Sequence, residues 1–174
     1  ATLTAFGFFT FHSAATAEEK KDAPKPADVA KTIEQSQNFF KQGEGKTRDA
    51  NYRSALESFN QAIQLNPAWS SPYVSRGVVR SRLGDHQGAL QDLEQAARLN
   101  PSDAMIYAHR GSVRYNLGEA EAALADLNKA IELNPTLAAA FVNRGYIHTQ
   151  SQNFESAIAD FDQALRVQPS YTPA

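Results

Sequence analysis

The sequence lacks cysteine altogether and has one methionine and one tryptophan among its 174 residues. Without cysteine, the chain forms no disulfide, has no thiol nucleophile and binds no metal through thiolates. A protein without cysteine suits an oxidising or a reducing compartment, so this absence does not indicate a location. The sequence also lacks a large excess of either charge, since its formal net charge is −2 at pH 7. A nucleic-acid-binding domain normally presents a basic face, so nucleic acid is not predicted as a partner.

Motifs for catalysis and for cofactors are missing as well. The four histidines, His12, His86, His109 and His148, do not have the spacing of metal ligands. The glycines stand singly and form no phosphate-binding loop. No Ser/His/Asp set can be assembled from the sequence. The sequence therefore predicts no metal, no cofactor and no catalytic residue, and it indicates a protein that is not an enzyme.

What the sequence does contain is a unit that recurs every 34 residues. Prolines, glycines, alanines and large apolar residues all return at this interval. The sets are Pro67, Pro101, Pro135 and Pro169; Gly43, Gly77, Gly111 and Gly145; Ala55, Ala89, Ala123 and Ala157; Ala62, Ala96, Ala130 and Ala164; Phe39, Tyr73, Tyr107 and Phe141; and Phe59, Leu93, Leu127 and Phe161. A fixed period of this size is typical of a repeat architecture.

Each unit, numbered so that its proline is position 32, is predicted to form two helices. The aromatic residue at position 4 and the glycine at position 8 share one face of the first helix. Ala89, Leu93 and Ala96 follow the i, i+4, i+7 pattern of the second helix. Gly84-Asp85 is typical of one helix ending and the next beginning. Small residues at positions 8, 20 and 27 are expected to let the two helices approach closely.

This pattern resembles the tetratricopeptide repeat family in its 34-residue length and in its small, aromatic and proline positions. Ser75-Arg76-Gly77 and its equivalents are similar to bacterial, cyanobacterial or plastid members. The resemblance implies an all-α fold, an α-solenoid in which four helix-turn-helix repeats stack into a right-handed superhelix. It also implies a concave groove lined by the first helices. The repeats are expected at about 36–69, 70–103, 104–137 and 138–171.

Residues 1–17 differ from the rest of the chain. An uncharged run rich in phenylalanine ends in Ala15-Thr16-Ala17, which resembles a signal-peptidase site. The run is too short to span a bilayer. We interpret it as the end of a secretory or thylakoid-type targeting segment, which predicts a periplasmic or lumenal location. A membrane anchor cut short, a segment that contacts a partner, and a tail without function stay open, as does a cytoplasmic location.

Residues 18–27 are charged, contain two prolines and are predicted to be a solvated linker ahead of a repeat domain at 28–174. We expect the first helix to begin near Asp28, and Gly43-Glu44-Gly45-Lys46 interrupts the repeat pattern, so the first repeat is expected to be atypical. Terminal repeats are often atypical because they cap the stack.

The outer flank of the last predicted helix would carry Ile158, Phe161 and Leu165. An uncovered solenoid end exposes an apolar strip, and exposed apolar strips often bind another protein or a membrane. We therefore expect either a truncated chain or a contact with another molecule here, self-association included.

Arginines at position 7 and aspartates at position 23 occur together in repeats two to four and are both missing from repeat one, which has Gln42 and Ser58 there. The two sets are Arg76, Arg110 and Arg144, and Asp92, Asp126 and Asp160. One interpretation of the arginines is an anion-binding stripe. The joint loss favours the other interpretation, Arg–Asp ion pairs inside each hairpin, which suit the bidentate geometry of arginine.

The resemblance places the groove surface at positions 2, 5, 9 and 12. From these we select the candidate binding residues Phe40, Val74, Val78, Met105, Ser112, Tyr115, Val142, Tyr146 and Thr149. Relatives that bind acidic chaperone tails carry Lys and Asn at positions 5 and 9, where repeat two of this chain has two valines. The candidates are mostly apolar or small, and tyrosine suits interfaces. We expect the groove to bind an apolar or amphipathic protein segment, unless these residues only pack against each other.

These features predict a non-catalytic scaffold or adaptor that binds a polypeptide in its concave groove during the assembly of a protein complex. The apolar residues 1–17 extend this prediction to contact with a membrane or a membrane complex. Two alternatives stay open. One is a permanent structural subunit of a large membrane-associated complex, and the other is the regulatory domain of a longer protein.

Overall fold

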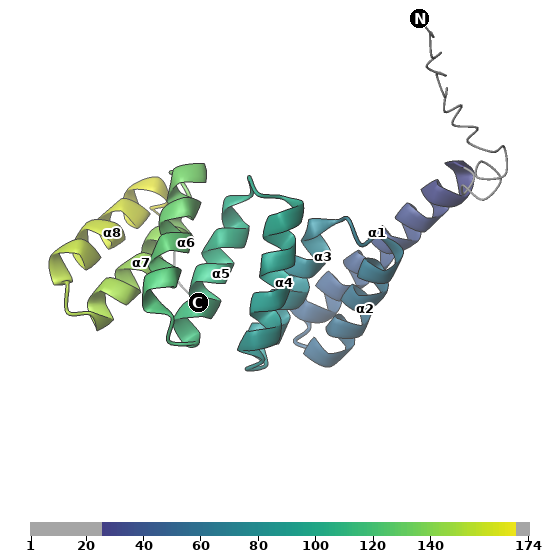
Figure 1. Cartoon of the computed structure of the whole chain (residues 1–174), viewed down its shortest axis with the longest axis horizontal. Helices are drawn as coiled ribbons and strands as arrows, with labels where there is room; N and C mark the ends of the chain where they lie inside the picture. Colours follow the sequence, from purple (N-terminus) through teal and green to yellow (C-terminus); the bar gives the residue numbers. More distant parts are fainter. Residues whose placement is uncertain (1–25, 170–174) are drawn as a thin grey trace, which may run out of the picture.

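The structure is a computed structural model that describes residues 26–169. Within this range the chain forms eight α-helices, which stand in one long row from α1 to α8 (Figure 1). They are α1 (Pro26–Arg48), α2 (Tyr52–Leu65), α3 (Ser70–Arg82), α4 (His86–Leu99), α5 (Ala104–Asn116), α6 (Ala120–Leu133), α7 (Ala138–Gln150) and α8 (Phe154–Val167). The predicted all-α solenoid is confirmed.

The apolar segment 1–17 and most of the predicted linker lie outside the described residues. Among residues 26–169, no helix combines the length and the apolar character that crossing a bilayer requires.

The helices pack in sequential pairs, and each pair packs on the next. The first helices of the repeats, α1, α3, α5 and α7, also contact one another from repeat to repeat. Within residues 26–169, no two of the second helices make such a contact. The row therefore bends toward the first helices, which line its inner side.

Small residues set the distance between the two helices of a hairpin. A Cβ atom on Gly111 would lie 2.9 Å from Cγ of Leu127 and 3.1 Å from the backbone oxygen of Ala123. Both separations are shorter than an ordinary van der Waals contact, so α5 and α6 can pack this closely only around a glycine. Leu127 is fully buried against this site, as are the neighbouring alanines Ala123 and Ala130.

The turn between the helices of each hairpin needs one residue with positive φ. Gly84 and Gly118 provide it with φ values of 84° and 82°, as the glycine at these helix ends predicted. Repeats one and four use Ala50 and Gln152 instead, with φ values of 56° and 59°. The turn geometry is thus common to all four repeats, although only two of them have the glycine that signals it.

The first repeat is more regular than predicted. Helix α1 begins at Pro26, inside the stretch predicted as linker, because proline is well tolerated in the first turn of a helix. The stretch Gly43–Lys46, which interrupts the sequence pattern, is nevertheless helical, since α1 continues to Arg48. A Cβ atom on Gly43 would lie 2.5 Å from the ring of Phe59, so this glycine provides the same close helix contact as Gly111.

We predict that Gly111→Ala lowers the free energy of unfolding by about 1–3 kcal/mol, because the added methyl group overpacks the contact with α6. The matched control is Gly45→Ala, where nothing lies within 4 Å of the added methyl group. This control should raise stability by up to about 1 kcal/mol, since alanine favours the helix. Urea unfolding followed by circular dichroism measures both changes. Equal effects of the two substitutions would contradict the close-packing role of Gly111.

Candidate functional site

The structure brings the predicted arginines and aspartates together inside their hairpins. In repeat three, Nε of Arg110 donates to Oδ2 of Asp126 at 2.8 Å, and Nη2 donates to Oδ1 at 2.6 Å. The pairs Arg76–Asp92 and Arg144–Asp160 have the same two-bonded geometry. The three aspartates are buried. The hydrogen bond to Asp126 raises the pKa of Arg110, so this guanidinium stays charged.

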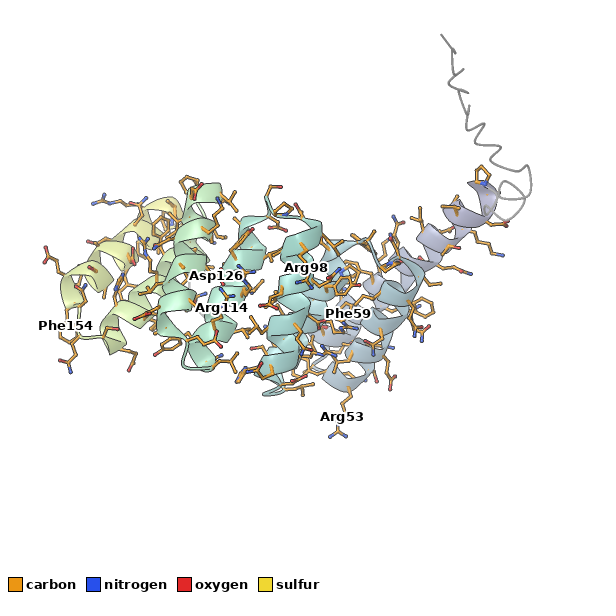
Figure 2. The ribbon with its side chains drawn as sticks, viewed as in Figure 1. Arg53, Phe59, Arg98, Arg114, Asp126 and Phe154 are labelled. Atoms are coloured by element: carbon orange, nitrogen blue, oxygen red, sulfur yellow. The ribbon has the colours of Figure 1, made fainter. Side chains whose placement is uncertain are left out.

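A second cation reaches the same carboxylate in the middle repeats. Nη1 of Arg114 donates to Oδ2 of Asp126 at 2.8 Å (Figure 2). Arg80 makes the equivalent bond to Asp92 in repeat two. Arg80 and Arg114 occupy position 11 of their repeats. In repeat four, position 11 is His148, whose Nε2 lies 3.9 Å from Oδ2 of Asp160. Each middle aspartate therefore accepts hydrogen bonds from two arginines, and the aspartate of repeat four accepts them from one.

Two of the position-7 arginines, Arg76 and Arg144, also connect neighbouring repeats. Nη1 of Arg76 donates to Oδ1 of Asn60 in α2, and Arg144 makes the same 2.6 Å bond to Asn128 in α6. The guanidinium of Arg76 lies over the ring of Tyr73, 5.6 Å from its centroid. These arginines are thus engaged within and between repeats, which favours the ion-pair interpretation over an anion-binding stripe.

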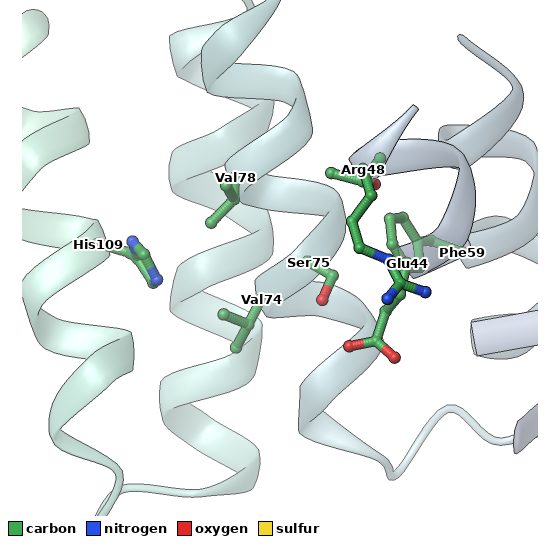
Figure 3. A pocket seen from close by; sticks show the side chains of 8 residues that line it. Glu44, Arg48, Phe59, Val74, Ser75, Val78 and His109 are labelled. Atoms are coloured by element: carbon green, nitrogen blue, oxygen red, sulfur yellow. The ribbon is translucent and has the colours of Figure 1, made fainter. Parts of the chain in front are cut away.

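The inner side of the row contains two hollows. The first, hollow A, has a volume of about 380 Å³ and draws its walls from α1, α2, α3 and α5. Its lining residues are Glu44, Thr47, Arg48, Phe59, Val74, Ser75, Val78 and His109. Figure 3 shows that His109 extends from α5 toward Val74 and Val78 of α3, with Glu44 and Arg48 of α1 on the far side. Hollow A thus has apolar side chains in its middle and polar side chains at two edges.

The second hollow, hollow B, has a volume of about 210 Å³ and lies between α5 and α7. It is lined by Ser112, Tyr115, Asn143, Tyr146, Ile147 and Gln150. Tyr146 is half exposed and packs edge-on against Phe161, with the ring centroids 5.6 Å apart. An aromatic wall held in this way can contact a ligand without losing much side-chain freedom.

Five of the nine candidate groove residues line these hollows: Val74, Val78, Ser112, Tyr115 and Tyr146. The other four do not.

Phe40 packs against Phe59 and Trp69, with ring centroids 5.8 and 4.7 Å away. Val142 is buried in the core, and the hydroxyl of Thr149 donates to its own helix at the backbone oxygen of Gly145. Met105 is exposed, outside both hollows.

Sequence reasoning missed the polar edges of the hollows. Ser75, His109 and Asn143 occupy position 6 of their repeats, and Arg48 and Gln150 occupy position 13. Position 6 follows position 5 of the predicted stripe, and position 13 follows position 12. Because positions 6 and 13 are seven residues apart, they lie on one face of the helix and form a second stripe next to the predicted one. A scan of the sequence for a polar stripe next to the apolar one would have found them.

Burial lowers the pKa of His109, with a further lowering by Arg82 and an opposing effect of Asp103. Its imidazole is therefore neutral at pH 7.

The row of paired helices, the short-range contacts and the grooved inner side define an α-helical repeat protein of the solenoid class. A TPR repeat profile matches residues 111–151, and tetratricopeptide repeat profiles match residues 70–103 and 138–171. Together these stretches cover more than half of the chain. The chain therefore belongs to the tetratricopeptide repeat family.

Solved structures of low sequence identity share this fold. MamA has 22% identity, a TM-score of 0.69 and coverage of 82% of this chain and 84% of its own. YrrB, described as a TPR protein with an unusual peptide-binding site, has 25% identity, a TM-score of 0.66 and coverage of 83% and 77%. The first TPR of Spaghetti (RPAP3), solved with the HSP90 peptide SRMEEVD, has 22% identity, a TM-score of 0.66 and coverage of 70% and 95%. A comparison with curated protein sequences found no significant match.

We predict that Asp126→Ala destabilises the protein by roughly 2–3 kcal/mol, because it leaves two partly buried arginines without their carboxylate. This cost is below the 3–5 kcal/mol that is typical of a fully buried pair, since solvent reaches part of both arginines. Asp160→Ala should cost less, because Asp160 binds one arginine only. Thermal unfolding compares the two variants with Asp162→Ala, an exposed control expected to change stability by at most about 0.5 kcal/mol. A melting temperature unchanged by Asp126→Ala would refute the pairing.

We predict that the wild type loses more stability than His109→Gln on acidification from pH 7 to pH 5. The folded state lowers the pKa of His109, so the unfolded chain takes up this proton at a higher pH, and acid favours unfolding through this group. The pH dependence of Tm for the two proteins measures the difference. Parallel curves would show that His109 is not held neutral by burial.

Proposed function

We propose that this protein is a non-catalytic adaptor that binds an apolar or amphipathic segment of a partner polypeptide in its concave groove. One observation carries the proposal: both hollows on the inner side of the helix row combine apolar side chains with a polar edge. Ligand sites in proteins are commonly built in this way, with apolar walls for affinity and a few polar groups for orientation.

The arrangement of the two hollows suits a polypeptide better than a small molecule. Hollow A offers Val74 and Val78, and hollow B offers Tyr146, so one segment crossing α3, α5 and α7 can place a side chain in each. The amides of Asn143 and Gln150 both donate and accept hydrogen bonds, as the backbone of an extended segment requires.

The similar structures support a peptide ligand, and the lining of hollow A favours a different chemistry from that of the HSP90 peptide. The first TPR of Spaghetti binds the HSP90 peptide SRMEEVD, so a protein of this fold can bind a peptide. That peptide is acidic, whereas the two oppositely charged side chains that line hollow A, Glu44 and Arg48, offset each other. Hollow A thus has no excess of positive charge to attract an acidic segment, so we propose a segment anchored by apolar side chains.

The cellular role that we propose is assembly of a membrane-associated complex, in a periplasmic, lumenal or membrane-bound setting. This part of the proposal rests on the apolar run at residues 1–17, which lies outside the described residues. Membrane fractionation of the 174-residue chain with and without residues 1–17 tests it. An equal distribution of the two forms would reject the membrane role and leave groove binding untouched.

We predict that Val78→Arg combined with Tyr146→Ala weakens capture of the partner at least tenfold without unfolding the protein. Arginine places an unpaired charge at hollow A, and alanine removes the aromatic wall of hollow B. The control variant Gln91→Arg adds the same charge to an exposed position of the second helix α4 and should capture the partner normally.

The experiment uses affinity capture with mass spectrometry, followed by peptide scanning of any protein that the wild type and Gln91→Arg both retain. Fluorescence anisotropy with the strongest peptide gives Kd for each variant. If the double variant binds that peptide as tightly as the wild type while circular dichroism shows it folded, the groove is not the binding site.

A further inference from the structure

The outer face of α8 carries an exposed apolar strip, which we call the end strip. It consists of Phe154, Ile158 and Leu165, which are 59%, 60% and 54% exposed in the structure of residues 26–169. Figure 2 shows Phe154 at the far end of the helix row. Phe161, which was also expected on this face, instead packs inward against Tyr146.

The same face of the second helix is an interface in the three earlier repeats. Position 21 is Ile158 in the end strip, and its equivalents Leu56, Leu90 and Leu124 all pack against the following repeat. Leu56 lies in one cluster with Val79 of α3, and Leu90 lies in another with Val113 of α5. The end strip is therefore a fourth copy of a surface that the fold has already used three times.

A polar position within this face is also repeated. Position 25 is Asn60 in α2, Glu94 in α4 and Asn128 in α6. The two asparagines each accept a 2.6 Å hydrogen bond from the position-7 arginine of the next repeat, and the carboxylate of Glu94 attracts the corresponding Arg110. The equivalent residue of α8 is Asp162, which is exposed. Within residues 26–169, Asp162 has no ion pair. A carboxylate at position 25 attracts an incoming arginine, as Glu94 attracts Arg110 and lies 3.8 Å from Arg114 at the interface of α4 with α5. A direct hydrogen bond from an arginine to Asp162 would be charge-assisted.

The helices that cover this face share one pattern, apolar, Arg, apolar at i, i+4 and i+7. The three examples are Pro72, Arg76 and Val79 in α3; Ile106, Arg110 and Val113 in α5; and Ala140, Arg144 and Ile147 in α7. All six apolar side chains are buried.

Helix α1 has Asn38, Gln42 and Gly45 at these positions, so the first repeat of a second copy lacks the complementary face. Head-to-tail stacking of copies through α1 is therefore disfavoured.

We propose that the end strip binds an amphipathic helix of a partner protein, with an apolar residue at i over Leu165, an apolar residue at i+7 over Ile158 and an arginine at i+4 that pairs with Asp162. The continuity of this face with the three internal interfaces and the charge of Asp162 carry the proposal. It concerns a surface outside the groove and does not depend on the proposed groove function.

The experiment titrates the 174-residue chain into a fluorescent, helix-stapled peptide with the sequence of residues 137–151, because α7 covers the most similar internal face. We expect saturable binding. Asp162→Arg should weaken it at least tenfold, and an Arg→Glu change at the peptide position that corresponds to Arg144 should restore binding to that variant. Ile158→Arg should abolish binding. The groove variant Val78→Arg serves as the control and should bind the peptide as the wild type does.

Three results would overturn the proposal. The first is a failure of the peptide to bind the end strip, seen either as no binding at all or as binding that neither Ile158→Arg nor Asp162→Arg weakens. The second is a dimer in ultracentrifugation that Ile158→Arg dissociates, which would make a second copy the occupant. The third is peptide binding that appears only after removal of residues 1–25, which would make that segment of the chain the occupant.

Discussion

The close contact of two helices around one glycine in each hairpin is the constraint on which the rest of the structure depends. At Gly111 there is no room for a Cβ atom beside Leu127 and the backbone of Ala123. Because the two helices lie so close, each hairpin is thin, and the first helices of successive repeats come into contact. Within residues 26–169 the first helices contact one another and the second helices do not, so the helix row bends toward the first helices. The groove is therefore a consequence of small residues in the hairpin core, although none of those residues lines it.

The Arg–Asp network has a different role from the apolar core. A buried ion pair often adds little net stability, because removing both charges from water costs about as much as their attraction returns. Its geometry, however, is specific: Arg76 binds Asp92 within its own hairpin and Asn60 of the preceding one. We interpret this two-way bonding, which Arg144 shares, as a feature that sets how repeats two and four sit on the preceding repeat.

The 34-residue period predicted the helices and their pairing, because a residue type that recurs at the same position of every repeat has the same structural role in each of them. The first repeat shows where this reasoning fails. Gly43 and Gly45 look alike in the sequence, yet Gly43 faces the ring of Phe59 and Gly45 faces open space, and a helix tolerates both. The groove was predicted less well, because its stripe came from the family resemblance and took no account of the local bend. Val142 lies on that stripe and is buried, whereas His109, one residue away from it, lines hollow A.

The central claim is that the inner side of the helix row holds a polypeptide. Photo-crosslinking within the native cell tests it most directly, with a photoreactive amino acid at Ser112, in hollow B, and separately at Ala125, on an exposed position of α6. The account predicts a defined partner crosslinked from position 112 and none from position 125. A partner crosslinked from position 125 and never from position 112 would contradict it.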